Sequence, residues 1–269
     1  MSKPIKATNT QWHKLFTDTL EMTLTPVDIQ VYGEIPVMNN PPKADVLLLR
    51  VKGRRWTKAQ RTLLPDGIRD RHAGHVLIEF KYTESLNERV YQKAAGYDAF
   101  YKEAQKLTND AVQSYIVLSK TPRKARLITN GYEQAKWPGV MVSERDVFRR
   151  MPLILLNELD PTPHNLAFKL FASRREQKET TATEILEKSL PDGLKNLAHF
   201  MKAYKEVDMA VAQYGAEEIM RLGRGLGKDY VRNLSLEDRL EGLSAEDRIK
   251  GMSQDELDQL RHILKVETP

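Results

Sequence analysis

Two acidic residues and one lysine stand at the ends of apolar segments, where they could share a metal ion. Asp45 opens the apolar run at residues 44–51, and Glu79 and Lys81 end the apolar segment that begins at His75. In a β-strand, Glu79 and Lys81 project from the same face, because successive side chains alternate between faces. Carboxylates at the ends of adjacent hydrophobic strands are costly unless they bind a cation or find polar partners. If Asp45 lies alongside, two carboxylates and one ammonium meet in one small volume.

These groups favour a particular chemistry. Two hard oxygen ligands suit Mg²⁺, which keeps several waters and accepts phosphate oxygens from a substrate, and Mn²⁺ could substitute for it. We expect Asp45, Glu79 and the carbonyl oxygen of Phe80 to be the ligands. The metal would polarise a phosphate ester and lower the pKa of an attacking water, while Lys81 orients that water or offsets phosphate charge. The alternative is a structural salt bridge of Glu79 with Lys81 or Asp45 at a sheet edge.

The elements that must position these residues follow an α-β-β-β-α-β order. Apolar spacing predicts a helix over residues 11–21, and alternation and apolar runs predict strands over 27–37, 44–51 and 75–82. A long helix over 87–107 carries an apolar stripe, and a strand over 114–119 follows it. Shorter strands are expected at 139–142 and 153–159. This order predicts an α/β layer architecture.

Asp45, the Glu79-Phe80-Lys81 triplet and this order of elements resemble the PD-(D/E)XK phosphodiesterase superfamily of restriction-type and repair nucleases. Gln92, Gly96 and Tyr97 on the following helix are similar to the Gln-and-Tyr helix of several branches. The branch that looks most similar is that of the bacterial recombination-promoting, transposase-associated (Rpn/YhgA-like) nucleases. The resemblance covers roughly residues 10–160, and its motifs are short.

The resemblance implies a restriction-endonuclease-like core with a mixed sheet and an Mg²⁺-dependent DNA endonuclease activity. It implies Asp45 and Glu79 as metal ligands, Lys81 as the catalytic cation and Gln92 as a supporting active-site residue. Ala44 stands where the family's name has proline. Since no base-reading pattern is present, we expect little sequence specificity. A catalytically inactive nuclease fold that binds nucleic acid or protein, and assembles through its helical tail, is the alternative.

Two further acids are candidates for an additional metal contact. Glu21 ends the first predicted helix, and first-helix acids have this role in parts of the superfamily. Glu34 lies late in the first predicted strand. Each is otherwise an ordinary solvated or paired surface acid.

A basic segment separates Asp45 from Glu79. Residues 50–75 contain eight Lys or Arg against two Asp, a net +6 that exceeds the +5 of the whole chain. With Trp56 among them, these cations are the footprint expected of a surface that meets a polyanion, because each neutralised phosphate releases counterions. A solvated basic loop is the alternative. The partner predicted is DNA, with RNA left open, and the binding residues are Arg50, Lys52, Arg54, Arg55, Lys58, Arg61, Arg69 and Arg71.

The chain changes character after Arg174. We expect a nuclease-like domain over residues 1–174, a helical extension over 175–233 and a tail of short helices over 234–269. The tail repeats a nine-residue unit at 234–242, 243–251 and, in decayed form, 252–260. Such units bury little core, so we interpret the tail as a surface for a protein partner or for self-assembly, or as an extended solvated segment. A homodimer would supply the two sites that a double-strand cut needs.

Composition limits the remaining function classes. The 269 residues include no cysteine, which excludes disulfides, thiolate nucleophiles and Cys-ligated metal sites. No stretch approaches the roughly 20 apolar residues of a membrane span, and the N-terminus lacks the apolar segment of a signal peptide. We therefore expect a cytoplasmic protein without a membrane partner. The glycine-rich run at 223–228 follows no predicted strand, so we expect a flexible helix terminus rather than a phosphate-binding loop.

Overall fold

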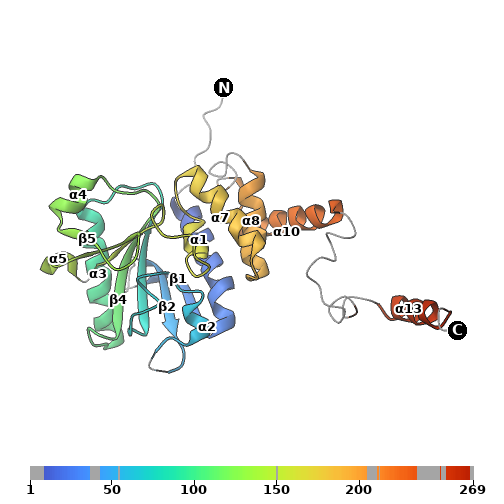
Figure 1. Ribbon diagram of the computed structural model, residues 1–269. Helices are drawn as coiled ribbons and strands as arrows, with labels where there is room; N and C mark the ends of the chain where they lie inside the picture. The colour runs from blue at the N-terminus through green and yellow to red at the C-terminus, as the bar shows by residue number, and fades with distance from the viewer. Residues whose placement is uncertain are drawn as a thin grey trace. The chain divides into compact units, whose positions relative to one another are not determined.

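The computed structural model describes residues 9–36, 43–53, 55–149, 151–204, 211, 213–234, 249 and 253–266. Contacts along the chain separate two units, Met1–Leu226 and Gly227–Pro269. The first unit contains every strand of the described residues (Figure 1). The residues predicted to form the site all have numbers within it. Among the described residues, no helix has the length and apolar character that crossing a membrane would require.

A mixed sheet with the strand order β1-β2-β3-β4-β7-β6-β5 forms the centre of the first unit. β1 (Ile29–Pro36) pairs antiparallel with β2 (Lys43–Arg50), and β2 pairs antiparallel with β3 (His75–Lys81). β3 pairs in parallel with β4 (Val112–Leu118), with Lys81 in register with Leu118. The carboxyl ends of β3 and β4 therefore lie at the same edge of the sheet.

The second half of the sheet is shorter. β4 pairs in parallel with β7 (Leu153–Leu155), and β6 (Val140–Ser143) joins β7 and β5 (Tyr132–Gln134) by antiparallel ladders. Parallel neighbours need a crossover, and α3 (Glu88–Gln105) supplies the one between β3 and β4.

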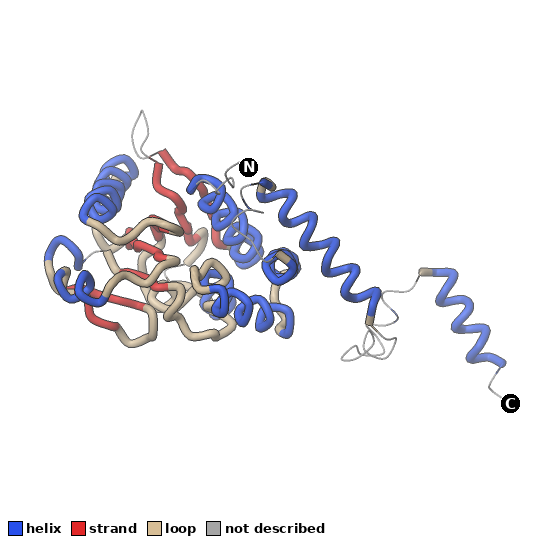
Figure 2. Tube along the Cα trace, turned by 90° about the horizontal axis from the view of Figure 1, so that it is seen from above, coloured by secondary structure: helices blue, strands red, loops and turns tan. Residues whose placement is uncertain are grey.

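Helices cover both faces of the sheet (Figures 1 and 2). One face packs against α1 (Asn9–Leu24), with α6, α7 and α8 beyond it, and the other packs against α3. The remaining elements of the first unit are η1 (Thr25–Val27), α2 (Lys58–Arg61), α4 (Lys124–Thr129), α5 (Asp146–Arg149), α6 (Leu166–Lys169), α7 (Arg175–Glu187), α8 (Asp192–Ala203) and the first part of α10 (Ala216–Asn233).

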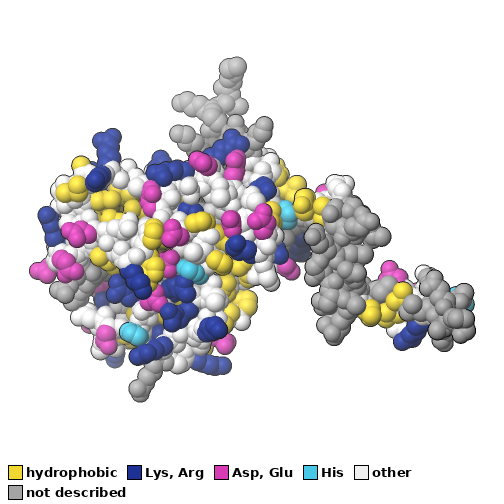
Figure 3. Space-filling model, in the orientation of Figure 1, with side chains coloured by type: hydrophobic (Ala, Val, Ile, Leu, Met, Phe, Trp, Pro, Cys, Tyr) yellow, Lys and Arg dark blue, Asp and Glu magenta, His cyan; other side chains and the backbone are white. Residues whose placement is uncertain are grey.

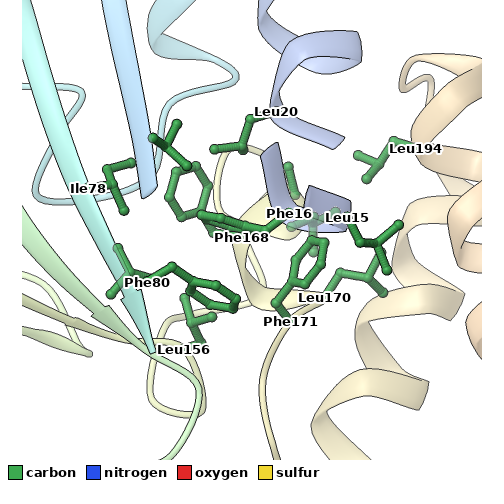
Figure 4. Packing of buried hydrophobic residues seen from close by; sticks show 14 of the residues in the cluster. Leu15, Phe16, Leu20, Ile78, Phe80, Leu156, Phe168, Leu170, Phe171 and Leu194 are labelled. Carbon is green, nitrogen blue, oxygen red and sulfur yellow. The ribbon is translucent and has the colours of Figure 1, made fainter. Parts of the chain in front are cut away.

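The larger core explains why the first helix forms and where it lies. Its apolar residues recur with helical spacing, so one stripe faces the sheet. In that stripe, Phe16 stacks on Phe80 of β3 with ring centroids 4.3 Å apart, and it meets Phe168 and Phe171 edge-on at 5.3 and 5.0 Å (Figure 4). Such aromatic contacts add to the energy of burial. α1 is thereby fixed against the strand that carries Glu79 and Lys81.

The α/β class, the mixed sheet and the C-terminal helices predicted from the sequence are confirmed. The α-β-β-β-α-β order is present, interrupted by η1 and α2. The expectation for residues 223–228 is wrong, because this run lies inside α10 rather than at its end. The glycine at 223 permits a close approach: a Cβ there would lie 1.9 Å from the backbone oxygen of Asn196 in α8.

Part of the predicted tail can be compared with the structure. α13 (Gln254–Val266) overlaps the third nine-residue unit, with Ser253 before its first turn. The Ser253 amide and hydroxyl both donate hydrogen bonds to Glu256 Oε2, and the Glu256 amide donates one to Ser253 Oγ. This reciprocal pattern is a capping box. The first two units lie outside the described residues, apart from Leu234 and Ile249.

Candidate metal-binding active site

The ladder between β2 and β3 ends where the acidic residues begin. Its last pair at this edge is Val46 with Ile78, and continuing the register would set Asp45 opposite Glu79. There, Asp45 Oδ2 accepts a hydrogen bond from the backbone N–H of Phe80 at 2.7 Å. Because the N–H and C=O of one strand residue point the same way, the Phe80 carbonyl also faces the side of Asp45.

The structure brings the three principal residues together. Lys81 Nζ lies 2.6 Å from Glu79 Oε1 and 3.9 Å from Asp45 Oδ2. All three are buried, with 8, 3 and 5% of Asp45, Glu79 and Lys81 exposed. Glu79 and Lys81 share a face of β3 because they are two residues apart. The cluster is thus a product of strand alternation and of the β2–β3 register together.

Lys93 of α3 is a member of the cluster that the sequence interpretation missed. Its Nζ lies 2.8 Å from Glu79 Oε1 and 5.1 Å from the ring centre of Tyr97. Burial disfavours the ammonium, but the hydrogen bond and charge of Glu79 outweigh it and raise the pKa of Lys93. A signal was present: Lys93 follows Val90 by three residues and precedes Tyr97 by four, so it falls on the sheet-facing stripe of the helix.

Gln92, expected to support the active site, lies elsewhere. Its side chain is exposed, and Nε2 donates a hydrogen bond to Glu88 Oε1 at 3.1 Å. One residue along an α-helix is a rotation of about 100°, which carries Gln92 off the stripe that Lys93 shares. The helix predicted from its apolar stripe is present, but it presents the Lys93 amine to Glu79 rather than the Gln92 amide.

His13 of α1 is a second residue that was missed. Its Nδ1 lies 3.5 Å from Asp45 Oδ1, and its ring meets Phe80 at 5.7 Å. Burial and, secondarily, the Lys81 ammonium lower the pKa of His13, which favours the neutral imidazole. Asp45 is therefore held by a backbone amide on one oxygen and neighboured by an imidazole on the other.

One carboxylate of the cluster has a raised pKa, and the other has an oxygen without a hydrogen-bond partner. Burial, followed by the charge of Glu79, raises the pKa of Asp45 to about 7, although Lys81 and Lys93 oppose this. Glu79 Oε2 is buried and has no hydrogen-bond partner among the described residues. The donor set of two carboxylates and a carbonyl consists of hard oxygens. These residues therefore fit a divalent cation such as Mg²⁺ or Mn²⁺.

The described chain contains no cluster of three or more His, Asp or Glu side chains arranged to hold a metal ion. A cation at Asp45 and Glu79 would depend on the Phe80 carbonyl and on water for its remaining ligands. Mg²⁺ is commonly bound in this way, through one or two carboxylates and several waters.

The basic segment at residues 50–75 lies at the opposite edge of the sheet. β2 runs away from Asp45 toward Arg50, and β3 runs from His75 toward Lys81, so the intervening segment joins the far ends of both strands. Five residues of strand separate Asp45 from Arg50, a distance of about 17 Å. In Figure 1, α2 of this segment lies at the lower end of the sheet and α4 at the upper end.

Several cations of this segment have partners within the protein. Arg50 donates hydrogen bonds to the carbonyl groups of Gly53 and His72 and lies over the ring of Trp56. Arg61 Nη2 pairs with Asp70 at 2.5 Å. Arg69 contacts His164 and Asp66, and Arg71 interacts with Tyr115. The side chains of Lys52, Arg55 and Lys58 are exposed, and Arg54 lies outside the described residues.

Of the two additional acids, Glu21 lies away from the cluster in the described structure. Glu21 is exposed on α1, eight residues beyond His13, which corresponds to about 12 Å along the helix axis. Glu34 lies in β1, and its side chain is outside the described part of the chain.

The site thus consists of Asp45, Glu79 and Lys81 with Lys93 and His13, at the edge where β2 and β3 cease to pair. Its arrangement can neutralise, orient and deprotonate groups around a hydrated cation. The chain was compared with protein-family models, with curated proteins and with solved structures, and none of the three comparisons gives a match.

Proposed function

We propose that this chain is an Mg²⁺-dependent phosphodiesterase that cleaves DNA with little sequence specificity, on a PD-(D/E)XK-like, restriction-endonuclease-like core. The observation that carries the proposal is the convergence of Asp45, Glu79 and Lys81 at the gap between β2 and β3. The element order α1, β1, β2, β3, α3, β4 supports the same family resemblance.

Asp45, Glu79 and the Phe80 carbonyl would hold the cation, and Mn²⁺ would substitute for Mg²⁺. When bound, the metal supplies charge for the phosphate oxygens and lowers the pKa of a coordinated water. The partly protonated Asp45, with its pKa near 7, must lose its proton to act as a ligand.

The residues of this chain have separate tasks. The Phe80 amide fixes one oxygen of Asp45. Lys81, which lies between Glu79 and Asp45, is placed to orient a water or to offset charge on the scissile phosphate. Lys93 holds Glu79 from the α3 side. His13 is a neutral proton acceptor beside Asp45.

The proposal is tested with the purified full chain on supercoiled plasmid and on DNA and RNA oligonucleotides. We expect cleavage with Mg²⁺ or Mn²⁺ and none with a chelator. Asp45→Asn, Glu79→Gln and Lys81→Met should each lower cleavage by about 100-fold or more, because each removes a charge aimed at the reacting groups. Glu133→Gln, an exposed acid on β5, and Lys202→Ala, an exposed lysine on α8, are matched controls that should retain full activity.

The competing function is a nuclease fold that binds nucleic acid or protein without cutting. The pairing of Glu79 with two ammonium groups favours this alternative, because it neutralises the carboxylate without a metal. If no DNA or RNA tested is cut with either metal, or if cleavage persists in all three site variants, the nuclease proposal is wrong.

A further inference from the structure

A groove of about 960 Å³ lies between α3 and the segment that contains α4. Its volume is within the range of ligand pockets in proteins. The side chains that matter for its chemistry are two arginines, two amides and two aromatic rings: Arg123, Arg126, Gln92, Asn130, Tyr91 and Phe148.

Four cations precede and line this groove. The segment 119–132 contains Lys120, Arg123, Lys124 and Arg126 and no acidic residue. All four side chains are exposed, and none forms an ion pair with another described residue. Figure 3 shows Lys and Arg side chains on the upper left of the visible face, where Figure 1 draws α4. The cations of this surface are therefore available to a partner, whereas several cations of the segment at residues 50–75 already form contacts within the protein.

The segment begins beside the candidate active site. β3 and β4 are parallel, and the Ser119 amide just beyond β4 donates a hydrogen bond to the Lys81 carbonyl at 3.0 Å. Lys120 is the next residue along the chain. Ligands of α/β proteins characteristically bind outside the carboxyl ends of parallel strands. A polyanion on these cations would therefore approach Lys81, Glu79 and Asp45 from the correct edge of the sheet.

The interior of the groove combines aromatic and amide groups. Tyr91 is buried, and its ring lies 4.5 Å from that of the half-buried Phe148. Asn130 Nδ2 donates to the Tyr91 hydroxyl at 3.3 Å, and the exposed Gln92 lies on the α3 wall. Proteins bind single-stranded nucleic acid through a positively charged groove with aromatic rings against the bases. Paired bases in a duplex are stacked and cannot enter such a groove.

From these observations we infer that the groove between α3 and α4 binds an unpaired stretch of the nucleic-acid substrate. Arg123 and Arg126 contact its phosphates, Phe148 contacts a base, and Gln92 lies at the base edges. The inference rests on the proposed function and adds to it a substrate class, single-stranded or strand-separated nucleic acid. It also gives Gln92 a role in binding, away from the metal.

The test measures binding without cleavage. Fluorescence anisotropy of the full chain is recorded with a labelled 20-nucleotide single strand and with its duplex, in EDTA and over a range of salt concentrations. We expect the single strand to bind about tenfold more tightly than the duplex. The double substitution Arg123→Ala/Arg126→Ala should weaken single-strand binding at least about tenfold and reduce the log–log salt slope by about 1.4, or about 0.7 for each lost phosphate contact.

Matched variants separate the groove from general charge. Lys106→Ala/Lys202→Ala removes two exposed cations that belong neither to the groove nor to the basic segment, and it should leave binding unchanged. Phe148→Leu should weaken single-strand binding without changing the salt slope, because it removes a ring but no charge. Glu88→Gln removes the acid of the groove that pairs with Gln92, and it should tighten binding. Thermal unfolding of each variant checks that it is folded.

The outcomes distinguish this inference from the proposed function. If the lysine pair weakens binding as much as the arginine pair, if Phe148→Leu has no effect on single-strand binding, or if the duplex binds as tightly as the single strand, the inference is overturned. Effective competition by a mononucleotide would also overturn it, since that result indicates a small-molecule site. Loss of binding in the arginine pair, in a protein that never cleaves, would support the groove and reject the nuclease. Cleavage that is the same in the wild type and in the groove variants would support the nuclease and reject the groove.

Discussion

Asp45 is a residue whose charge is unfavourable for folding. Burial, and then Glu79, raises its pKa to about 7, whereas a carboxyl in an unfolded chain has a pKa of about 4. Between these values the folded protein binds a proton more tightly than the unfolded chain. Its free energy of unfolding therefore falls as the pH rises from about 4 to about 7.

Asp45→Asn should remove this dependence. The asparagine carbonyl can still accept the Phe80 N–H, but it carries no charge. Since each unit of pKa corresponds to about 1.4 kcal/mol, we expect the variant to be more stable than the wild type by up to about 4 kcal/mol at pH 8. The difference should vanish below pH 4. Urea unfolding in EDTA at both pH values measures it, and an equal effect at the two pH values would contradict the assigned cause.

Lys93 competes with a metal ion for the same carboxylate. We expect Lys93→Gln to bind Mn²⁺ several-fold more tightly, because a cation 2.8 Å from Glu79 Oε1 is removed. Electron paramagnetic resonance titration of free Mn²⁺ measures the affinity. Lys58→Gln makes the same change of charge on α2 and should leave it unaltered. Weaker Mn²⁺ binding in the Lys93 variant would show that this lysine organises the site rather than competing for it.

At the level of residues, the acids and Lys81 could be predicted because they interrupt apolar strands, where unpartnered charge is costly. Lys93 could have been predicted from the phase of its helix, but the family resemblance directed attention to Gln92. The place of His13 in the site could not be predicted, because its contact with Asp45 depends on how α1 lies across the sheet. Periodicity defines which stripe of a helix is buried and leaves its axial position open.

Among the elements, α10 shows how a local pattern can mislead. Three glycines within five residues predict a break in a helix, yet the helix continues. Gly223 is required by packing, since a Cβ would meet the Asn196 backbone, whereas a Cβ at Gly225 would meet nothing within 4 Å. A sequence shows the glycines but not the neighbouring helix that explains one of them.

This pair of glycines gives a matched test. Gly223→Ala should destabilise the protein by about 1–3 kcal/mol, because α10 must move away from α8. Gly225→Ala should stabilise it by up to about 1 kcal/mol, because alanine has the higher helix propensity. Denaturant unfolding measures both. Similar effects of the two substitutions would mean that α10 does not pack on α8 as described.

The long, strongly patterned elements were predictable, and so were the two short apolar strands β6 and β7, whereas other short elements were not. β2, β3, α3 and β4 have clear apolar periodicity. The helical extension expected from residue 175 begins with α7. In contrast, α4 and β5 were not anticipated, because neither contains enough apolar residues to show a period. Elements of three to six residues owe their conformation to the structure around them.

For the whole molecule, the division of contacts near residue 226 leads to a prediction about the tail. A chain that ends at Asn233 should retain the urea unfolding midpoint and the cleavage activity of the full chain. Tryptophan fluorescence reports on this directly, since Trp12, Trp56 and Trp137 all belong to the first unit. A lowered midpoint would show that the tail contributes to the stability of the first unit. Sedimentation of both chains would show whether the tail mediates self-association.

The two ammonium groups beside Glu79 also affect how the protein can be handled. A zinc finger loses its structure when a chelator removes the metal, because its ligands have no other counterions. Here Lys81 and Lys93 already offset the negative charge of Glu79. Exhaustive dialysis against EDTA should therefore yield a protein that is folded but inactive. Addition of magnesium alone should then restore turnover without a refolding step, and circular dichroism before and after dialysis should be superimposable.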